Sequence, residues 1–181
     1  MIWTKLGILL IGFTSAGALP YTVGKALAHV KFDINTQTLS FLSNKNIYGE
    51  RYKKGYKWLL FSTALFTYLF FWLLTRYYDL GEHERLMGYI NLSFVSLALL
   101  AFMPHNIEPY SLKSLAPTLQ RFLHNVLAVI VFLTLPALII TFQVIILQDF
   151  IFLGISGLII IAINLLSVLL AIFKKRLEWN S

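Results

Sequence analysis

The chain has 181 residues, of which 58% are hydrophobic and only 13% are charged, and its formal net charge is +7. A soluble domain of this length would need a far more polar surface, so an integral membrane protein is expected. The positive charges lie at the ends of apolar segments and form no single basic face, which argues against nucleic-acid binding. There is no cysteine, which excludes disulfides, cysteine-ligated zinc, iron–sulfur clusters and thiol catalysis.

Five apolar segments follow one another along the chain. The expected spans are about residues 6–28, 57–76, 85–104, 120–147 and 150–174. Each is close to the roughly 20 residues that a helix needs to cross hydrocarbon, and none alternates with the period of a barrel strand. The sequence therefore predicts an all-α fold, a polytopic membrane bundle of five transmembrane helices in a single domain over residues 1–181.

Particular residues are expected to bend and end these helices. Pro20 in the first segment and Pro136 in the fourth each remove a helical hydrogen bond, which favours a bend. Only Gln148 and Asp149 separate the fourth segment from the fifth. One continuous helix through both would have about 50 residues, more than twice the thickness of a bilayer. A tight helical hairpin is therefore predicted at this junction.

The distribution of lysine and arginine predicts the orientation of the spans. With five crossings, the first loop, the third loop and the C-terminus share one side, which carries twelve of the fifteen basic residues. The opposite side carries the other three, Lys5, Arg76 and Arg85. Because basic residues accumulate on the cytoplasmic side, the N-terminus is expected outside and the C-terminus in the cytoplasm, in a bacterial inner membrane.

The interior of the segments carries no Asp, Glu, Lys or Arg, which argues against a proton-coupled transporter with a carboxylate relay. In the fifth segment, Gly154, Gly157 and Asn164 fall on one helical face, together with Ser167 and Ala171. Small residues allow helices to approach closely, and an asparagine can form a hydrogen bond across the contact. This face is predicted either to pack within the chain or to contact a second copy or another subunit of a membrane complex.

Chemically capable side chains concentrate on the predicted cytoplasmic side. His105 follows the third segment, and Arg121, His124 and Asn125 share the first turns of the fourth. Imidazole pairs can ligate a metal or haem, and basic residues beside amides can hold a phosphate headgroup. Interfacial histidines without a ligand are the third alternative, because the two histidines lack a spacing such as HExxH. No cofactor is expected, with haem or a metal ion as the alternative.

A second basic group precedes the second segment. Lys53, Lys54 and Lys57 lie within the loop from Lys45 to Lys57, and each basic residue near a membrane surface contributes about 1 kcal/mol of attraction to anionic lipid. Membrane lipids with anionic headgroups are therefore the predicted partners on the cytoplasmic side.

The stretch from Pro104 to Thr141 resembles a known family. A proline-punctuated loop leads into LQRFLHNVLA at residues 119–128, followed by Phe132 and Pro136. The pattern is similar to an uncharacterised family of bacterial multi-span membrane proteins distantly akin to the Frag/DRAM/Sfk group. The resemblance implies a membrane-embedded bundle associated with lipid organisation. It identifies His124 as a position of the family's motif but assigns no role to it. The family usually has six spans and an extracytoplasmic first loop, whereas this chain has five segments and a basic first loop.

These patterns favour a small membrane protein that interacts with lipid or serves as a subunit of a membrane complex. An enzyme is not expected, because the chain has no nucleophile elbow, glycine-rich phosphate loop or paired-carboxylate signature. Two alternatives stay open. One is a membrane redox protein that binds haem or a metal through His105 and His124. The other is a lipid-modifying enzyme at the cytoplasmic interface, in which His105, Arg121 and His124 would converge.

Overall fold

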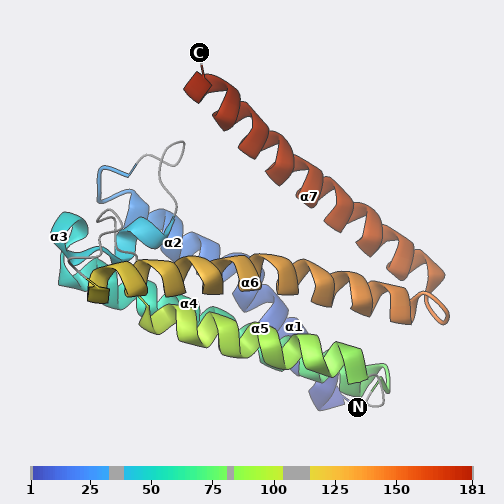
Figure 1. The fold of residues 1–181 in the computed structure, drawn as a ribbon. Helices are drawn as coiled ribbons and strands as arrows, with labels where there is room; N and C mark the ends of the chain where they lie inside the picture. Colours follow the sequence, from blue (N-terminus) through green and yellow to red (C-terminus); the bar gives the residue numbers. More distant parts are fainter. Residues whose placement is uncertain (1, 33–38, 81–83, 104–114, 181) are drawn as a thin grey trace. The chain divides into compact units, whose positions relative to one another are not determined.

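A computed structural model describes residues 2–32, 39–80, 84–103 and 115–180 of the chain (Figure 1). Within these residues every regular element is helical and no strand is present. The elements are α1 (Ile2–Phe13), the π-helical segment η1 (Thr14–Ala18), α2 (Leu19–Leu27), the 3-10 helix η2 (Leu39–Ser43), α3 (Lys45–Tyr48), α4 (Glu50–Tyr77), α5 (Glu84–Phe102), α6 (Leu115–Ile146) and α7 (Ile151–Asn180). The predicted all-α fold is confirmed.

Among the described residues, five helical stretches are long and apolar enough to cross a membrane. They are Ile2–Leu27, which joins α1, η1 and α2, and then Glu50–Tyr77, Arg85–Phe102, Leu115–Ile146 and Ile151–Leu170. These correspond to the five predicted spans, and α6 and α7 are separate helices joined at residues 147–150, as the hairpin prediction required. The largest differences from the predicted bounds are at the start of α4, which begins at Glu50 because polar residues continue the helix before the apolar stretch, and at the end of α7, which continues to Asn180.

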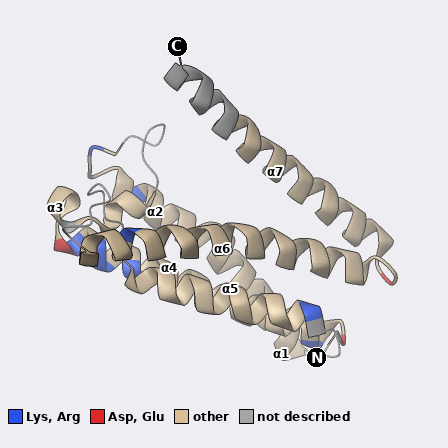
Figure 2. Cartoon of the chain, in the orientation of Figure 1, with Lys and Arg blue, Asp and Glu red and all other residues tan. Residues whose placement is uncertain are grey.

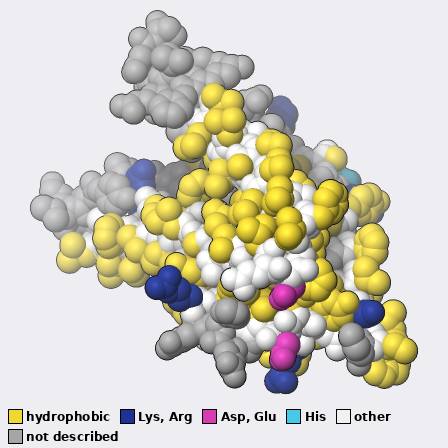
Figure 3. Space-filling model, turned by 90° about the vertical axis from the view of Figure 1, so that its right-hand side faces the viewer, with side chains coloured by type: hydrophobic (Ala, Val, Ile, Leu, Met, Phe, Trp, Pro, Cys, Tyr) yellow, Lys and Arg dark blue, Asp and Glu magenta, His cyan; other side chains and the backbone are white. Residues whose placement is uncertain are grey.

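The outer surface of these helices is apolar. Large hydrophobic side chains are widely exposed, including Trp3 at 84%, Phe13 at 76% and Phe152 at 87%. Figure 3 shows one face of the molecule, on which hydrophobic side chains cover most of the described surface and charged groups are few. Soluble monomers rarely expose contiguous apolar patches on this scale. The five helices therefore fit an integral membrane protein, in which lipid is the solvent of the exposed side chains.

The chain divides into two compact units, residues 1–134 and residues 135–181, with the boundary inside α6. In the first unit α4 is the central helix, and α5, α1, η2 and α3 all pack against it. Several of the buried positions on α4 and α5 carry small residues, namely Ala64, Ser93, Ser96 and Ala101. Small side chains let helix backbones approach closely, which is how helices associate where lipid removes the hydrophobic driving force.

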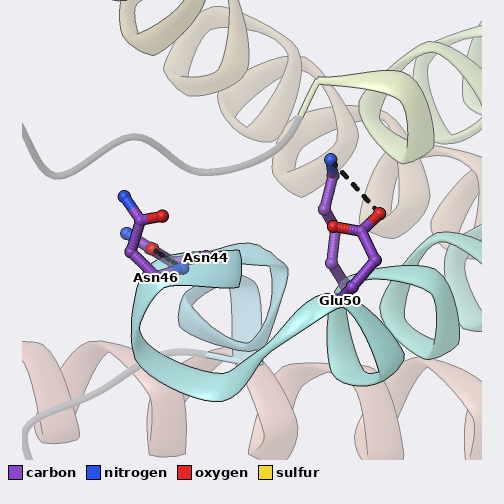
Figure 4. A network of polar contacts seen from close by, with 4 residues as sticks. Asn44, Asn46 and Glu50 are labelled. Atoms are coloured by element: carbon purple, nitrogen blue, oxygen red, sulfur yellow. Dashed lines mark hydrogen bonds and ion pairs between the residues drawn. The ribbon is translucent and has the colours of Figure 1, made fainter.

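The first loop contains a folded segment that the sequence analysis did not predict. In η2, Leu42 and Ser43 are buried, and the Ser43 hydroxyl donates to the Ser40 carbonyl over 2.6 Å. The Asn46 backbone N–H then donates to Asn44 Oδ1 over 3.0 Å, which starts α3 (Figure 4). Because η2 and α3 both contact α4, this segment fixes the part of the loop that leads into the second span.

Gly49 joins α3 to α4 with φ of 85° and ψ of 170°, a conformation that is essentially restricted to glycine. We expect Gly49→Ala to lower the free energy of unfolding by about 1–3 kcal/mol, because alanine would have to hold this strained conformation. Nothing lies within 4 Å of a Cβ added at this position, so steric contact does not contribute. Unfolding in mixed detergent micelles measures the change. Gly88→Ala is the matched control, since that glycine also has open space around it but no positive φ, and equal stability of the two variants would contradict the argument.

The second unit is a helical hairpin made by the end of α6 and by α7. Gly154 is buried, and a Cβ added there would lie 3.0 Å from the Gln143 carbonyl oxygen. A Cβ added at Gly157 would overlap the side-chain amide of Gln143. The near part of the predicted small-residue face therefore packs within the chain. Further along this face Asn164 and Ser167 are exposed, and the amide nitrogen of Asn164 donates to the Ile160 carbonyl of its own helix over 3.0 Å. Contact of Asn164 with a partner stays a prediction.

Candidate functional site

Basic residues gather at one end of the first unit, where α2 ends and where α4 and α6 begin (Figure 2). We call this the basic end; its described members are Lys25, Arg51, Lys53, Lys54, Lys57 and Arg121. The apolar part of α4 from Trp58 to Thr75 is about 27 Å long at 1.5 Å per residue, which nearly matches the roughly 30 Å of a hydrocarbon core. The preceding residues of α4, Glu50 to Lys57, therefore extend about 12 Å further and reach headgroup depth.

The three lysines predicted to contact headgroups have different surroundings. Lys54 is exposed. The ammonium of Lys53 lies 3.7 Å from Glu50 Oε1 one turn away, as the dashed line in Figure 4 shows. Such a partly exposed ion pair contributes at most about 1 kcal/mol, so an anion can compete for the lysine. Lys57 lies 4.0 Å from the centre of the Phe102 ring, at the last turn of α5, where a cation also compensates the helix dipole.

His124 links the start of α6 to the end of α5. Its Nδ1 lies 2.6 Å from the carbonyl oxygen of Met103, and the side chain is only 3% exposed. A carbonyl can only accept, so Nδ1 carries the proton and donates this hydrogen bond. The contact satisfies a carbonyl group at the end of α5 that has no helical partner. His124 therefore has a structural partner at Nδ1 and holds the start of α6 to the end of α5.

The other residues of the predicted site are only partly placed. His105 lies outside the described residues. Arg121 is half-buried one turn before His124 on α6, and Asn125 is exposed beside it. In the part of the chain that the structure describes, no group of three or more His, Asp or Glu side chains could hold a metal ion. The described residues thus bring Arg121 and His124 together, through their spacing on one helix.

The basic end also contains a cavity, which was not predicted from the sequence. It has a volume of about 460 Å³ and lies between α2, η2 and the start of α4. Three basic side chains line it, Lys25, His29 and Arg51, and two tyrosines of α4, Tyr52 and Tyr56. The only available signal was spacing, since Lys25 and His29 share one helical face, as do Arg51 and Gly55. Spacing does not tell which of these faces meet in the folded chain.

No protein-family model matches this chain, and no curated protein and no solved structure is significantly similar to it.

Proposed function

We propose that this protein is a multi-pass integral membrane protein that interacts with lipid, and that its basic end binds anionic headgroups at the cytoplasmic face of a bacterial inner membrane. In this orientation the N-terminus lies outside and the C-terminus in the cytoplasm. The observation that carries the proposal is the gathering of basic residues of α2, α4 and α6 at one end of the first unit. A role as a subunit of a membrane complex is compatible with the same basic surface.

The chemistry of the basic end supports headgroups as its partners. Three of its lysines, Lys53, Lys54 and Lys57, lie on the turns of α4 that extend past the apolar stretch, at the depth where phosphate groups are found. Glu50 is the one acidic residue in α4, and its carboxylate already lies near Lys53. At the opposite end of α4, Arg76 is followed closely by Asp79, so the positive charge there is partly compensated. Attraction to anionic lipid is therefore expected mainly at the basic end.

Removing the lysine charges tests this proposal. We expect the triple variant Lys53→Gln, Lys54→Gln, Lys57→Gln to lose most of the enrichment of anionic lipid around the protein, because each charge contributes about 1 kcal/mol, or about fivefold. The full chain is reconstituted in vesicles of equal parts phosphatidylcholine and phosphatidylglycerol. Polymer-bounded discs are then extracted, and the phosphatidylglycerol fraction around the protein is measured.

The matched control removes three charges from the opposite end, with Lys5→Gln, Arg76→Gln and Arg85→Gln. We expect this control to keep most of the phosphatidylglycerol enrichment. We also expect that raising the salt concentration weakens the enrichment around the wild type. An unchanged phosphatidylglycerol fraction in the lysine variant, or an equal loss in the control, would contradict the proposed function.

A further inference from the structure

The first span leaves α4 partway along its length. On α1, a Cβ added at Gly7 would lie 3.0 Å from Leu73, and one added at Gly12 would lie 3.4 Å from Phe70, so α1 packs closely on α4. Cβ atoms added at Gly17 and Gly24 would meet nothing within 4 Å. Helix α1 packs along α4, whereas α2 makes little contact with it. A gap therefore opens between α2 and the first half of α4.

The π-helical segment η1 lies where the two helices part. It covers Thr14–Ala18, immediately before α2 and its Pro20. A π-helical turn inserts an extra residue into the helix and changes its direction, and such turns occur often at functional sites. The divergence of α2 from α4 is thus built into the backbone at η1, and the cavity at the basic end lies inside the resulting gap.

The cavity is positively charged on one side and apolar on the other. Lys25 and His29 enter it from the end of the first span and Arg51 from the first turn of α4, and none of the described residues that line it is acidic. The Nδ1 of His29 lies 2.8 Å from the Lys25 carbonyl oxygen, so Nδ1 donates to that carbonyl, and Nε2 donates to an anion only in the doubly protonated form of the ring. Val23 and Leu59 form part of the apolar wall. An anionic group attached to an apolar chain complements both sides.

A second cavity lies deeper along the first span and α4. Its volume is about 360 Å³, and it lies between η1 and the middle of α4, where Ser15 and Thr67 line it. Leu59 of the first cavity and Thr67 of the second are eight residues apart on α4, about 12 Å along the axis. One leaflet of the hydrocarbon core is about 15 Å deep. An acyl chain that starts at the first cavity therefore has the length to reach the second.

We propose that one anionic phospholipid molecule occupies this gap, with its phosphate among Lys25, His29 and Arg51 and one acyl chain along α4 towards the deeper cavity. The inference rests on the proposed function and narrows it, because it names a single retained lipid in addition to the attraction of the basic end for the membrane surface. A soluble phosphate would satisfy the three basic groups but not the apolar walls and the second cavity, so the occupant is a lipid.

Gly55 offers a way to close the cavity without changing its charge. It lines the first cavity, and a Cβ added there would meet nothing within 4 Å. Gly55→Phe is expected to abolish the retained lipid by filling the space that the lipid occupies. Gly24→Phe is the matched control, because Gly24 also has open space around it but does not line the cavity. Arg51→Gln is expected to lower retention about tenfold by removing one charge-assisted hydrogen bond.

Native mass spectrometry of the full chain in mild detergent measures retention. The wild type, incubated with phosphatidylglycerol or phosphatidylcholine, is expected to keep one phosphatidylglycerol and little phosphatidylcholine. Equal retention of the two lipids, or retention that Gly55→Phe and Arg51→Gln leave unchanged, would overturn the proposal. Displacement of the lipid by inorganic phosphate alone would also overturn it, in favour of a site for a soluble anion.

The two proposals fail in different ways. Gly55→Phe keeps all the charges of the basic end, so it should leave the phosphatidylglycerol enrichment in reconstituted discs unchanged while the single retained lipid is lost. If the lysine variant keeps its enrichment but Gly55→Phe loses the retained lipid, the cavity is confirmed as a lipid site and the wider role of the basic end is wrong. If instead the lysine variant loses its enrichment and Gly55→Phe keeps the retained lipid, only the lipid site in the cavity is wrong.

Discussion

Replacing His124 by alanine is expected to lower the free energy of unfolding by about 2 kcal/mol. The imidazole is only 3% exposed, and its Nδ1 lies 2.6 Å from the Met103 carbonyl oxygen. Alanine would leave a void at the start of α6 and a carbonyl group at the end of α5 without its donor. Both changes destabilise a buried site, and water cannot replace the donor easily there. Unfolding in mixed detergent micelles gives the change in free energy.

Two further variants isolate the hydrogen bond. His124→Asn keeps an N–H group close to the position of Nδ1, so it should recover part of the loss. Phe122→Ala removes a ring of similar size that is 54% exposed on the same helix, so it should cost much less. If His124→Ala destabilised the protein no more than Phe122→Ala, a structural role for the histidine would be wrong. His124 would then return to the candidate ligand residues.

The spans could be predicted from the sequence because they depend on composition and length alone. An apolar stretch of about 20 residues with charged ends has few alternatives in a bilayer, and the two residues Gln148 and Asp149 leave no room for anything except a tight connection. The helix starts were less predictable. Glu50 to Lys57 are polar, yet they continue α4 because Gly49 ends the preceding turn and the residues that follow favour a helix.

The candidate site was predictable only in part. Grouping Lys53, Lys54 and Lys57 requires nothing more than their positions in the chain. The cavity requires that Lys25 and Arg51, 26 residues apart in sequence, face each other, which depends on how the helices pack. The π-helical segment Thr14–Ala18 has no clear sequence signal, although Pro20 predicted a bend nearby. The partner of His124 also depends on tertiary packing, since Met103 lies 21 residues away.

Replacing Gly154 by leucine is expected to destabilise the α6–α7 hairpin by about 3 kcal/mol, at the upper end of the cost of overpacking. A Cβ at this position would lie 2.7 Å from Leu147 Cδ1 and 3.0 Å from two backbone atoms, the Gln143 carbonyl oxygen and Leu147 Cα. The Leu147 side chain could move away. The backbone at Gln143 and Leu147 could not move without separating the two helices. The free energy of unfolding in mixed micelles measures the effect.

Gly157 provides the matched comparison. The atoms nearest to an added Cβ there belong to the flexible end of the Gln143 side chain. Gly157→Ala should therefore destabilise the hairpin much less than Gly154→Leu. In the double variant Gly157→Ala, Gln143→Ala, part of the cost of Gly157→Ala should be relieved. Equal costs at the two glycines, or no relief in the double variant, would contradict the packing described for this hairpin.

The same variants distinguish packing within the chain from self-association. If Gly154 and Gly157 contacted a second copy, the stability lost on substitution would depend on protein concentration, because dimerisation stabilises by mass action. Packing against α6 of the same chain predicts no such dependence. Any concentration dependence should instead follow Asn164, whose side chain is exposed and bonds only to its own helix among the contacts that the structure records. Asn164→Ala would then weaken association while leaving the stability of the hairpin unchanged.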